Sequence, residues 1–82
     1  MRLDKFLKVS RILKRRTVAQ EACDGGKVEV NGRAAKPSCQ LKVGDLVCVR
    51  FASAALTFRV KMPKETVKKD EAADMYEIVT EL

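Results

Sequence analysis

Residues 1–32 read MRLDKFLKVSRILKRRTVAQEACDGGKVEVNG, and the rest of the chain is organised around them. Their first half, residues 1–16, carries seven basic side chains and one acidic side chain, Asp4, which gives a net charge of +6. The whole chain of 82 residues has the same formal net charge, from 17 Lys and Arg against 11 Asp and Glu. Residues 17–82 are therefore balanced, with ten basic and ten acidic side chains. A neutral domain with a cationic front end favours a polyanionic partner, such as nucleic acid or an anionic membrane surface.

The length and composition predict one small domain. The 82 residues, 46% of them apolar, are enough for a modest core, so wholesale disorder is not expected. The longest apolar runs are far shorter than the roughly 20 residues of a membrane-spanning helix, and the N-terminus lacks the apolar core of a signal peptide. We therefore expect a cytoplasmic protein. We also expect a monomer with a single domain over residues 1–82, made of a motif core over 1–51 and a hairpin and tail over 52–82.

A first helix is predicted over residues 1–9, because Leu3, Phe6 and Leu7 follow the i, i+3, i+4 spacing of one helical face. Basic residues recur at every third position from Arg2 to Lys14. That spacing drifts around a helix of 3.6 residues per turn, so these cations cannot share one face of a straight helix. We therefore expect a break near residues 10–14 that brings the later cations beside the earlier ones.

A second helix is predicted over Val18–Cys23. Thr17 and Gln20 have the spacing of a capping box, in which Thr17 would be the N-cap. Gly25 or Gly26 is expected to supply the left-handed residue that ends this helix. The side chains expected to turn inward are Val18, Ala19, Ala22 and Cys23.

Alternating polar and apolar residues predict a small, mostly antiparallel, twisted sheet of four or five strands. The first strand is expected over residues 27–30, and Asn31-Gly32 is the strongest kind of short hairpin signal before a return strand over 33–36. The other predicted elements are a turn at Gly44-Asp45, strands over 46–51 and 56–61, an end to the latter at Pro63, a helical turn over 68–73 and a strand over 75–79 that buries Tyr76 and Ile78 or their neighbours. The aromatic side chains expected on core faces are Phe6, Phe51, Phe58 and Tyr76.

The predicted fold class is therefore α+β, with a two-helix hairpin packed on the sheet. The chain has no histidine, so the commonest general base is missing. Its three cysteines are Cys23, Cys39 and Cys48, and an odd number without a Cys-x-x-Cys motif does not indicate a zinc site. We expect buried, reduced thiols. The sequence predicts no catalytic residue, no metal ion and no cofactor.

The densest basic cluster, Lys14-Arg15-Arg16, lies just before the predicted second helix. Cations are unfavourable at the positive end of a helix dipole, and a bound phosphate would explain them there. A solvated basic loop is the alternative interpretation. Asp4 is expected to pair with a neighbouring cation. We predict an RNA-binding surface and call it the basic surface, with the residues Arg2, Lys5, Lys8, Arg11, Lys14, Arg15 and Arg16. Within it, Arg16→Ala is expected to weaken binding by about 1–3 kcal/mol and to leave folding nearly unchanged.

The segments RLDKFL and KRRTVAQEACDGGKVEVNG resemble the RNA-binding domain named after small-subunit ribosomal protein S-four. The family pattern is a helix that opens on Leu-Asp, an Arg-Arg before the second helix, and a Gly-x-Val-x-Val-Asn-Gly hairpin. Here these are Leu3-Asp4, Arg15-Arg16 and the residues from Gly26 through Gly32. The later KVGDLVCVRF resembles the closing strand of that fold. The resemblance implies an αL-type RNA-binding motif, with Arg2, Arg15 and Arg16 at its basic positions and Arg16 and Arg2 first among its contacts.

Over its full length the chain resembles the RqcP (YabO) family, stand-alone bacterial relatives of heat-shock protein fifteen, through MRLDKFLKVSR, KRRT, VRF and KKDEAADMY. The resemblance implies a factor without enzymatic activity that binds stalled large ribosomal subunits. Its partners would be large-subunit rRNA, P-site peptidyl-tRNA and the NFACT-family protein RqcH, whose C-terminal alanine tailing it supports. Heat-shock protein fifteen has a longer basic C-terminal extension, whereas this chain ends in Thr-Glu-Leu, which favours the RqcP branch. The alternatives are a recycling factor like heat-shock protein fifteen and a non-specific DNA-binding protein.

Overall fold

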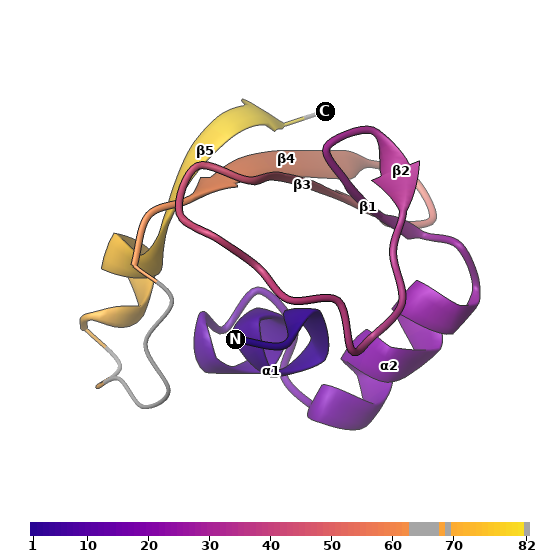
Figure 1. Ribbon diagram of the computed structural model, residues 1–82, viewed down its shortest axis with the longest axis horizontal. Helices are drawn as coiled ribbons and strands as arrows, with labels where there is room; N and C mark the ends of the chain where they lie inside the picture. The colour runs from indigo at the N-terminus through magenta and orange to yellow at the C-terminus, as the bar shows by residue number, and fades with distance from the viewer. Residues whose placement is uncertain (63–67, 69, 82) are drawn as a thin grey trace.

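Two helices lie beneath one curved five-stranded sheet in the computed structural model, and a long loop over residues 35–45 crosses between the two layers (Figure 1). The structure describes residues 1–62, 68 and 70–81, and it describes residues 80 and 81 by their backbone only. The element order is α1 (Leu3–Val9), α2 (Arg16–Asp24), β1 (Val28–Val30), β2 (Arg33–Ala34), β3 (Leu46–Arg50), β4 (Ala55–Val60), the 3-10 helix η1 (Ala72–Met75) and β5 (Tyr76–Glu81).

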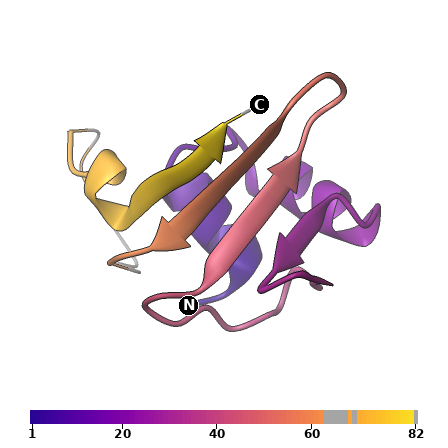
Figure 2. The same ribbon diagram turned by 90° about the horizontal axis from the view of Figure 1, so that it is seen from above.

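The sheet has the strand order β2-β1-β3-β4-β5, and each pair of neighbours runs antiparallel. Figure 2 shows the strands side by side, with both helices behind them. The predicted α+β class is confirmed, as are the two-helix layer and the antiparallel sheet. The helices thus cover one face of the sheet, and this shared interior holds the core.

The hairpin between β1 and β2 depends on two residues with positive φ. Asn31 has a φ of 53° and Gly32 a φ of 84°, as a type I′ turn requires. The Asn31 side chain also ties the hairpin to β3, because its Oδ1 accepts a hydrogen bond of 3.0 Å from the backbone N–H of Leu46. The predicted hairpin is confirmed, although β2 is shorter than the expected return strand over 33–36.

A run of aromatic rings joins the helical layer to the sheet. Phe6 of α1 stacks on Phe58 of β4 with ring centroids 5.9 Å apart, and Phe58 meets Tyr76 of β5 edge-on at 5.5 Å. Phe6 and Phe58 are fully buried and Tyr76 is half-buried, so these three core predictions are confirmed. The prediction for Phe51 is wrong, because β3 ends at Arg50 and Phe51 lies in the following turn with 44% of its surface exposed.

The start of α2 corrects the predicted capping box. The helix begins at Arg16, so Arg15 is its N-cap and Thr17 is already the second helical residue, with no side-chain cap hydrogen bond. Ala19 and Cys23 are buried and Ala22 packs against the core, as predicted, but Val18 is 43% exposed, so the prediction for Val18 is wrong. The capping-box prediction is therefore wrong at Thr17.

The other end of α2 is a Schellman motif. Gly25 is the C-cap, and Gly26 follows it with a φ of 73°. The N–H of Gly26 donates to the carbonyl of Cys23 at 3.0 Å, and the N–H of Lys27 donates to that of Ala22 at 2.9 Å. The predicted left-handed stop is therefore Gly26.

The tail contains β5, which confirms the last predicted strand. Of the residues expected to be buried here, Tyr76 is half-buried and its neighbour Met75 is buried, but Ile78 is 51% exposed, so the expectation is wrong for Ile78. The predicted helical turn over 68–73 appears slightly later, as η1, with Ala72 and Met75 buried. The expected end of a strand at Pro63 lies outside the described residues.

Replacing Gly26 by Ala is expected to lower the free energy of unfolding by about 1 kcal/mol, because an L side chain disfavours positive φ. A Cβ at this position has no neighbour within 4 Å, so the cost is conformational and not steric. Denaturant titration measures it, and Gly26→Asn is the control, with a smaller loss because Asn tolerates the left-handed region. Equal losses for Ala and Asn would contradict this explanation.

Candidate nucleic-acid interface

Asp4 of α1 has 0% exposure, and the side chains of Arg2 and Arg16 gather around it. Its Oδ1 accepts hydrogen bonds from the backbone N–H of Lys5 at 2.8 Å and from Arg2 Nε at 3.2 Å. Its Oδ2 accepts from Arg16 Nε at 3.1 Å and from Gln20 Nε2 at 3.0 Å. The prediction that Asp4 pairs with a neighbouring cation is confirmed. Gln20, predicted to cap α2, instead binds this carboxylate.

The pKa of Asp4 falls from an ordinary 3.8 to about 2. Burial alone would raise the pKa of this carboxyl, since it disfavours the charged form. The hydrogen bonds from Gln20, Arg16, Arg2 and the backbone N–H of Lys5 outweigh burial and lower it. The carboxylate therefore remains ionised at every pH at which the protein is expected to work.

The loop over residues 37–41 holds the start of α1 in place. The N–H of Asp4 donates to the carbonyl of Pro37 at 3.1 Å, and Arg2 pairs with Gln40 as an isolated antiparallel β-bridge. These backbone bonds satisfy part of the N-terminal end of α1, which has no side-chain cap. The backbone of Arg2 is therefore fixed from the far side of the chain.

The link between the helices is ordered from within. Arg11 has a φ of 64°, which breaks the helix as the period-three spacing predicts. Ser10 is buried and its Oγ donates to the carbonyl of Leu7 at 3.4 Å, and the N–H of Leu13 donates to the same carbonyl at 3.0 Å. Ile12 and Leu13 pack against the core. The break therefore confirms the predicted bend and leaves the cations of the link on the outside.

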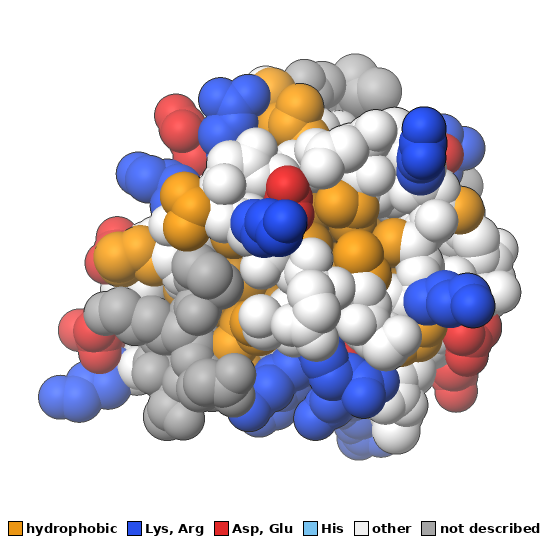
Figure 3. Space-filling view, in the orientation of Figure 1, with side chains coloured by type: hydrophobic (Ala, Val, Ile, Leu, Met, Phe, Trp, Pro, Cys, Tyr) orange, Lys and Arg blue, Asp and Glu red, His pale blue; other side chains and the backbone are white. Residues whose placement is uncertain are grey.

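The basic surface lies over the helical layer. In Figure 3 the Lys and Arg side chains gather along the lower edge of the view, below the helices, while basic and acidic groups mix elsewhere on this face. The contacts bring together Arg2 and Arg16. Lys8, Arg11, Lys14 and Arg15 are exposed, and Lys5 is half-buried.

Arg16 has a structural role that the sequence did not reveal. Its ion pair with a buried carboxylate contradicts the expectation that Arg16→Ala spares folding, because the change removes charged donors from Asp4. A signal was available, since Asp4 is the one acid among the first 16 residues and borders the apolar stripe of Leu3, Phe6 and Leu7 on the predicted first helix. A lone acid at the edge of an apolar stripe indicates a polar group that needs partners when it is buried.

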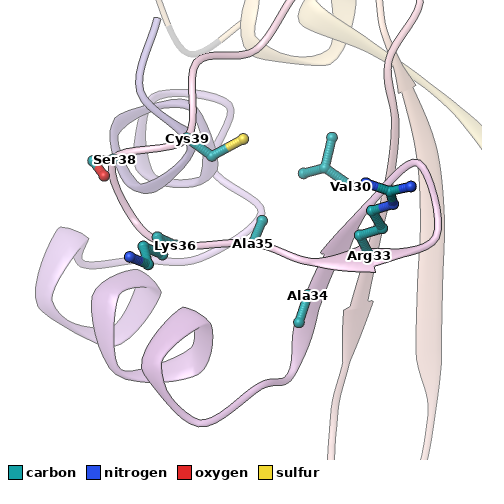
Figure 4. A pocket seen from close by; sticks show the side chains of 7 residues that line it. All are labelled: Val30, Arg33, Ala34, Ala35, Lys36, Ser38 and Cys39. Carbon is teal, nitrogen blue, oxygen red and sulfur yellow. The ribbon is translucent and has the colours of Figure 1, made fainter.

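A pocket lies between the β1–β2 hairpin and the segment that follows it, and Asp4 is not among its lining residues. Figure 4 shows Val30 and Cys39 facing each other across this pocket. Its volume is about 380 Å³. The residues that line the pocket are Val30, Arg33, Ala34, Ala35, Lys36, Ser38 and Cys39.

Among the residues that the structure describes, no group of His, Cys, Asp or Glu could hold a metal ion, and no helix is long and apolar enough to cross a membrane.

The three cysteines are free thiols, but only Cys23 is buried. Cys39 and Cys48 are half-buried, which corrects the expectation of burial for these two. Burial raises the pKa of Cys23 to about 11, and the negative charges of Asp4 and Asp24 add to the effect. Cys23 is therefore protonated and unreactive at neutral pH.

Comparison with known proteins identifies relatives for the whole chain. The S4 domain family matches residues 1–47. The RQC P-site tRNA stabilizing factor of Streptococcus pneumoniae is 56% identical over 81 residues, which cover 99% of this chain and 92% of that protein. The protein of the same name in Bacillus subtilis is 53% identical, with 99% and 94% covered. A trimeric structure of Vibrio cholerae Heat Shock Protein 15 is similar with a TM-score of 0.89 and 31% identity, over 96% of this chain and 81% of that chain.

Acid titration is expected to reveal the ion pairs of Asp4. Because its pKa is lower in the folded chain than in the unfolded chain, Asp4 stabilises the fold fully above about pH 4 and loses this contribution as the pH falls towards 2. The loss is about 2 kcal/mol of unfolding free energy. The carboxyl carbon resonance of Asp4 in an NMR titration should have its midpoint at about pH 2. A midpoint near 4 would show that the ion pairs do not form in solution.

Thiol alkylation of the native chain at neutral pH is expected to modify Cys39 and Cys48 before Cys23, because Cys23 is buried and has a raised pKa. Mass spectrometry of iodoacetamide-treated protein measures the order. The same reaction in denaturant is the control, and there all three thiols should react at similar rates. Fast labelling of Cys23 in the native chain would mean that α2 does not pack as described.

Proposed function

The chain belongs to the S4 domain family and, within it, to the branch of the RQC P-site tRNA stabilizing factors, and from this membership we propose that it binds stalled large ribosomal subunits and stabilises P-site tRNA. The observation that carries the proposal is the 56% identity to the Streptococcus pneumoniae factor, with 92% of that protein covered. A likeness of this extent includes both the helical layer and the tail. The role is one of binding, not of catalysis.

The basic surface is the proposed contact with RNA. Its cations lie over α1, α2 and the link between them, where the described first turn of α2 holds no acidic residue. Phosphate contacts set register and orientation, so such a surface suits RNA of defined shape more than a particular base sequence. We infer that it contacts large-subunit rRNA and the peptidyl-tRNA together.

The finer role is support of an RqcH-like NFACT protein on the same subunit, during addition of a C-terminal alanine tail to the stalled chain. A factor that holds the P-site tRNA in position would favour repeated rounds of tailing. The chain would act in the cytoplasm as a monomer. In a reconstituted tailing reaction, the protein should increase the length of the alanine tail.

A second candidate is a recycling role like that of heat-shock protein fifteen, which the TM-score of 0.89 to the Vibrio cholerae protein favours. The Escherichia coli Heat Shock Protein 15 is 37% identical over 82 residues, but this chain spans only 62% of its length. Tailing separates the two roles, because a recycling factor need not increase tail length. A non-specific DNA-binding role is disfavoured, since α2 has nine residues and is not a long recognition helix.

Co-sedimentation tests the proposed function directly. The protein is mixed with large ribosomal subunits that carry or lack peptidyl-tRNA and is then pelleted through sucrose at low salt. We expect it in the pellet, with more bound when peptidyl-tRNA is present. Recovery only in the soluble fraction would refute the proposal. Equal competition by duplex DNA and structured RNA would favour the DNA-binding alternative.

Replacing Lys14 and Arg15 together by Ala is expected to weaken subunit binding by about 1–3 kcal/mol per contact, because both side chains are exposed and available to phosphates. The salt dependence of log K should also become shallower, by about 1.5 for two lost contacts. The control is the double change Arg59→Ala and Lys61→Ala, which removes the same charge from exposed positions of the sheet layer. Equal weakening by both pairs would point to net charge alone.

A further inference from the structure

We propose that Asp4 is a positioning residue of the basic surface, which holds Arg2 and Arg16 by one edge of each guanidinium and leaves the opposite edges to bind RNA phosphates. This inference rests on the proposed function, because it concerns how the same surface binds RNA. Asp4 itself contacts no RNA in this arrangement. It acts through the two arginines.

The two arginines bind the carboxylate in the same way. Arg2 donates through Nε to Oδ1 at 3.2 Å and through Nη2 to Oδ2 at 3.3 Å. Arg16 donates through Nε to Oδ2 at 3.1 Å and through Nη2 to Oδ1, with a longer contact of 3.5 Å. Each guanidinium therefore faces Asp4 with its Nε–Nη2 edge and spans both oxygens. Two planar groups from separate parts of the chain are thus held by a single anion.

In the part of the chain that the structure describes, the opposite edges of both guanidinium groups have no hydrogen-bond partner. The Nη1 group and the second hydrogen on Nη2 are not used by Asp4, and they form a further fork of parallel donors. The side chains of Arg2 and Arg16 are 44% and 42% exposed, although that of Asp4 is 0% exposed. Such a fork matches the spacing of two phosphate oxygens. One buried anion thus orients two guanidinium groups whose remaining donors can bind a ligand from solvent.

Further hydrogen bonds hold Asp4, which we call the anchor of the two arginines. Gln20 and the backbone N–H of Lys5 also donate to the Asp4 oxygens, so the carboxylate cannot turn away from the arginines without losing these bonds. Arg2 is fixed by its backbone bridge to Gln40, and Arg16 is the first residue of α2. Both side chains are therefore ordered before RNA arrives, which lowers the entropic cost of binding.

Charge alone and a positioning role predict opposite effects of removing Asp4 on RNA affinity. A negative charge beside a phosphate-binding surface repels RNA, so its removal should strengthen binding if Asp4 were only a neighbour. If Asp4 positions the arginines, its removal should weaken binding despite the gain in net positive charge. The sign of the change therefore separates a positioning role from a simple charge effect.

The first test is a double-mutant cycle between Arg16→Lys and Asp4→Asn, with affinity for salt-washed large ribosomal subunits as the measurement. Lys keeps the charge of Arg16 but lacks the second planar edge, so we expect a loss of about three- to tenfold in affinity with an unchanged salt slope. Asp4→Asn should weaken binding by at least about fivefold, and Arg16→Lys should then add little. The matched control is Arg50→Lys, because Arg50 pairs with Glu29 at 3.0 Å on the sheet layer and should leave affinity unchanged.

The second test needs no change at Asp4, whose loss can prevent folding. NMR of the wild-type chain follows the Nε–H resonances of Arg2 and Arg16 while an RNA hairpin is added that competes with large subunits for the protein. We expect the Nε–H groups to stay protected from exchange, because Asp4 remains hydrogen-bonded to the Nε–Nη2 edge of each guanidinium. The Nη resonances should shift. Loss of Nε–H protection on binding would show that RNA displaces Asp4 and would overturn the inference.

The outcomes separate this inference from the function on which it rests. If the wild-type chain binds neither subunits nor the hairpin, the proposed function fails and the inference fails with it. If the wild-type chain binds but Asp4→Asn binds equally or more tightly, or Arg16→Lys behaves like Arg50→Lys, the positioning role alone is overturned. If Asp4→Asn does not fold, as judged by circular dichroism, the comparison of Arg16→Lys with Arg50→Lys and the Nε–H protection together decide.

Discussion

The ion pairs of one buried carboxylate connect the stability of this small domain to its cationic surface. A carboxylate without partners is costly to bury, and a core of this size has little stability to spare. Asp4 is nevertheless fully buried, because Arg2, Arg16 and Gln20 reach it from the start of α1 and from α2. The two helices must therefore dock in one arrangement for the anion to be satisfied. That arrangement places the remaining cations of the front end on the outside.

The sheet serves this arrangement as a scaffold. Phe6 on α1 stacks on Phe58, so the helix that carries Asp4 packs against β4, and Phe58 in turn meets Tyr76 of β5. The loop after the β1–β2 hairpin adds backbone bonds to the start of α1, including the one from Asp4 to the carbonyl of Pro37. Contacts from distant parts of the chain thus fix a surface that is almost entirely encoded in the first sixteen residues. The first sixteen residues thus carry the net positive charge, and residues 17–82, whose basic and acidic side chains balance, hold them in place.

Local steric rules made much of the fold predictable. Asn31-Gly32 and Gly26 follow from the few residues that accept positive φ, and the strands follow from alternation. The exposure of most cations of the basic surface was also predictable, since charged side chains favour solvent; their contact with RNA stays a prediction. The error at the start of α2 arose where a tertiary partner competed with a local one. Thr17 and Gln20 have the spacing of a capping box, but Gln20 binds Asp4, 16 residues away, and α2 begins earlier. The choice of arginine partners for Asp4 could not be read from spacing, because the bend at Arg11 decides which side chains meet.

The types of basic residue fit this physical picture. At positions 2 and 16 a side chain must satisfy a buried anion on one edge and still present donors to solvent, and only the planar guanidinium of arginine does both. Lys8 and Lys14 are exposed and are not among the donors to Asp4, so a hydrated point charge is sufficient for attraction to a phosphate backbone there. Arginine is therefore required at positions 2 and 16, whereas the exposed positions around them hold both residue types, Lys8 and Lys14 as well as Arg11 and Arg15. In the proposed function, Asp4 and its two arginines give orientation to a surface whose other cations supply mainly long-range attraction, and orientation is what recognition of a shaped RNA requires.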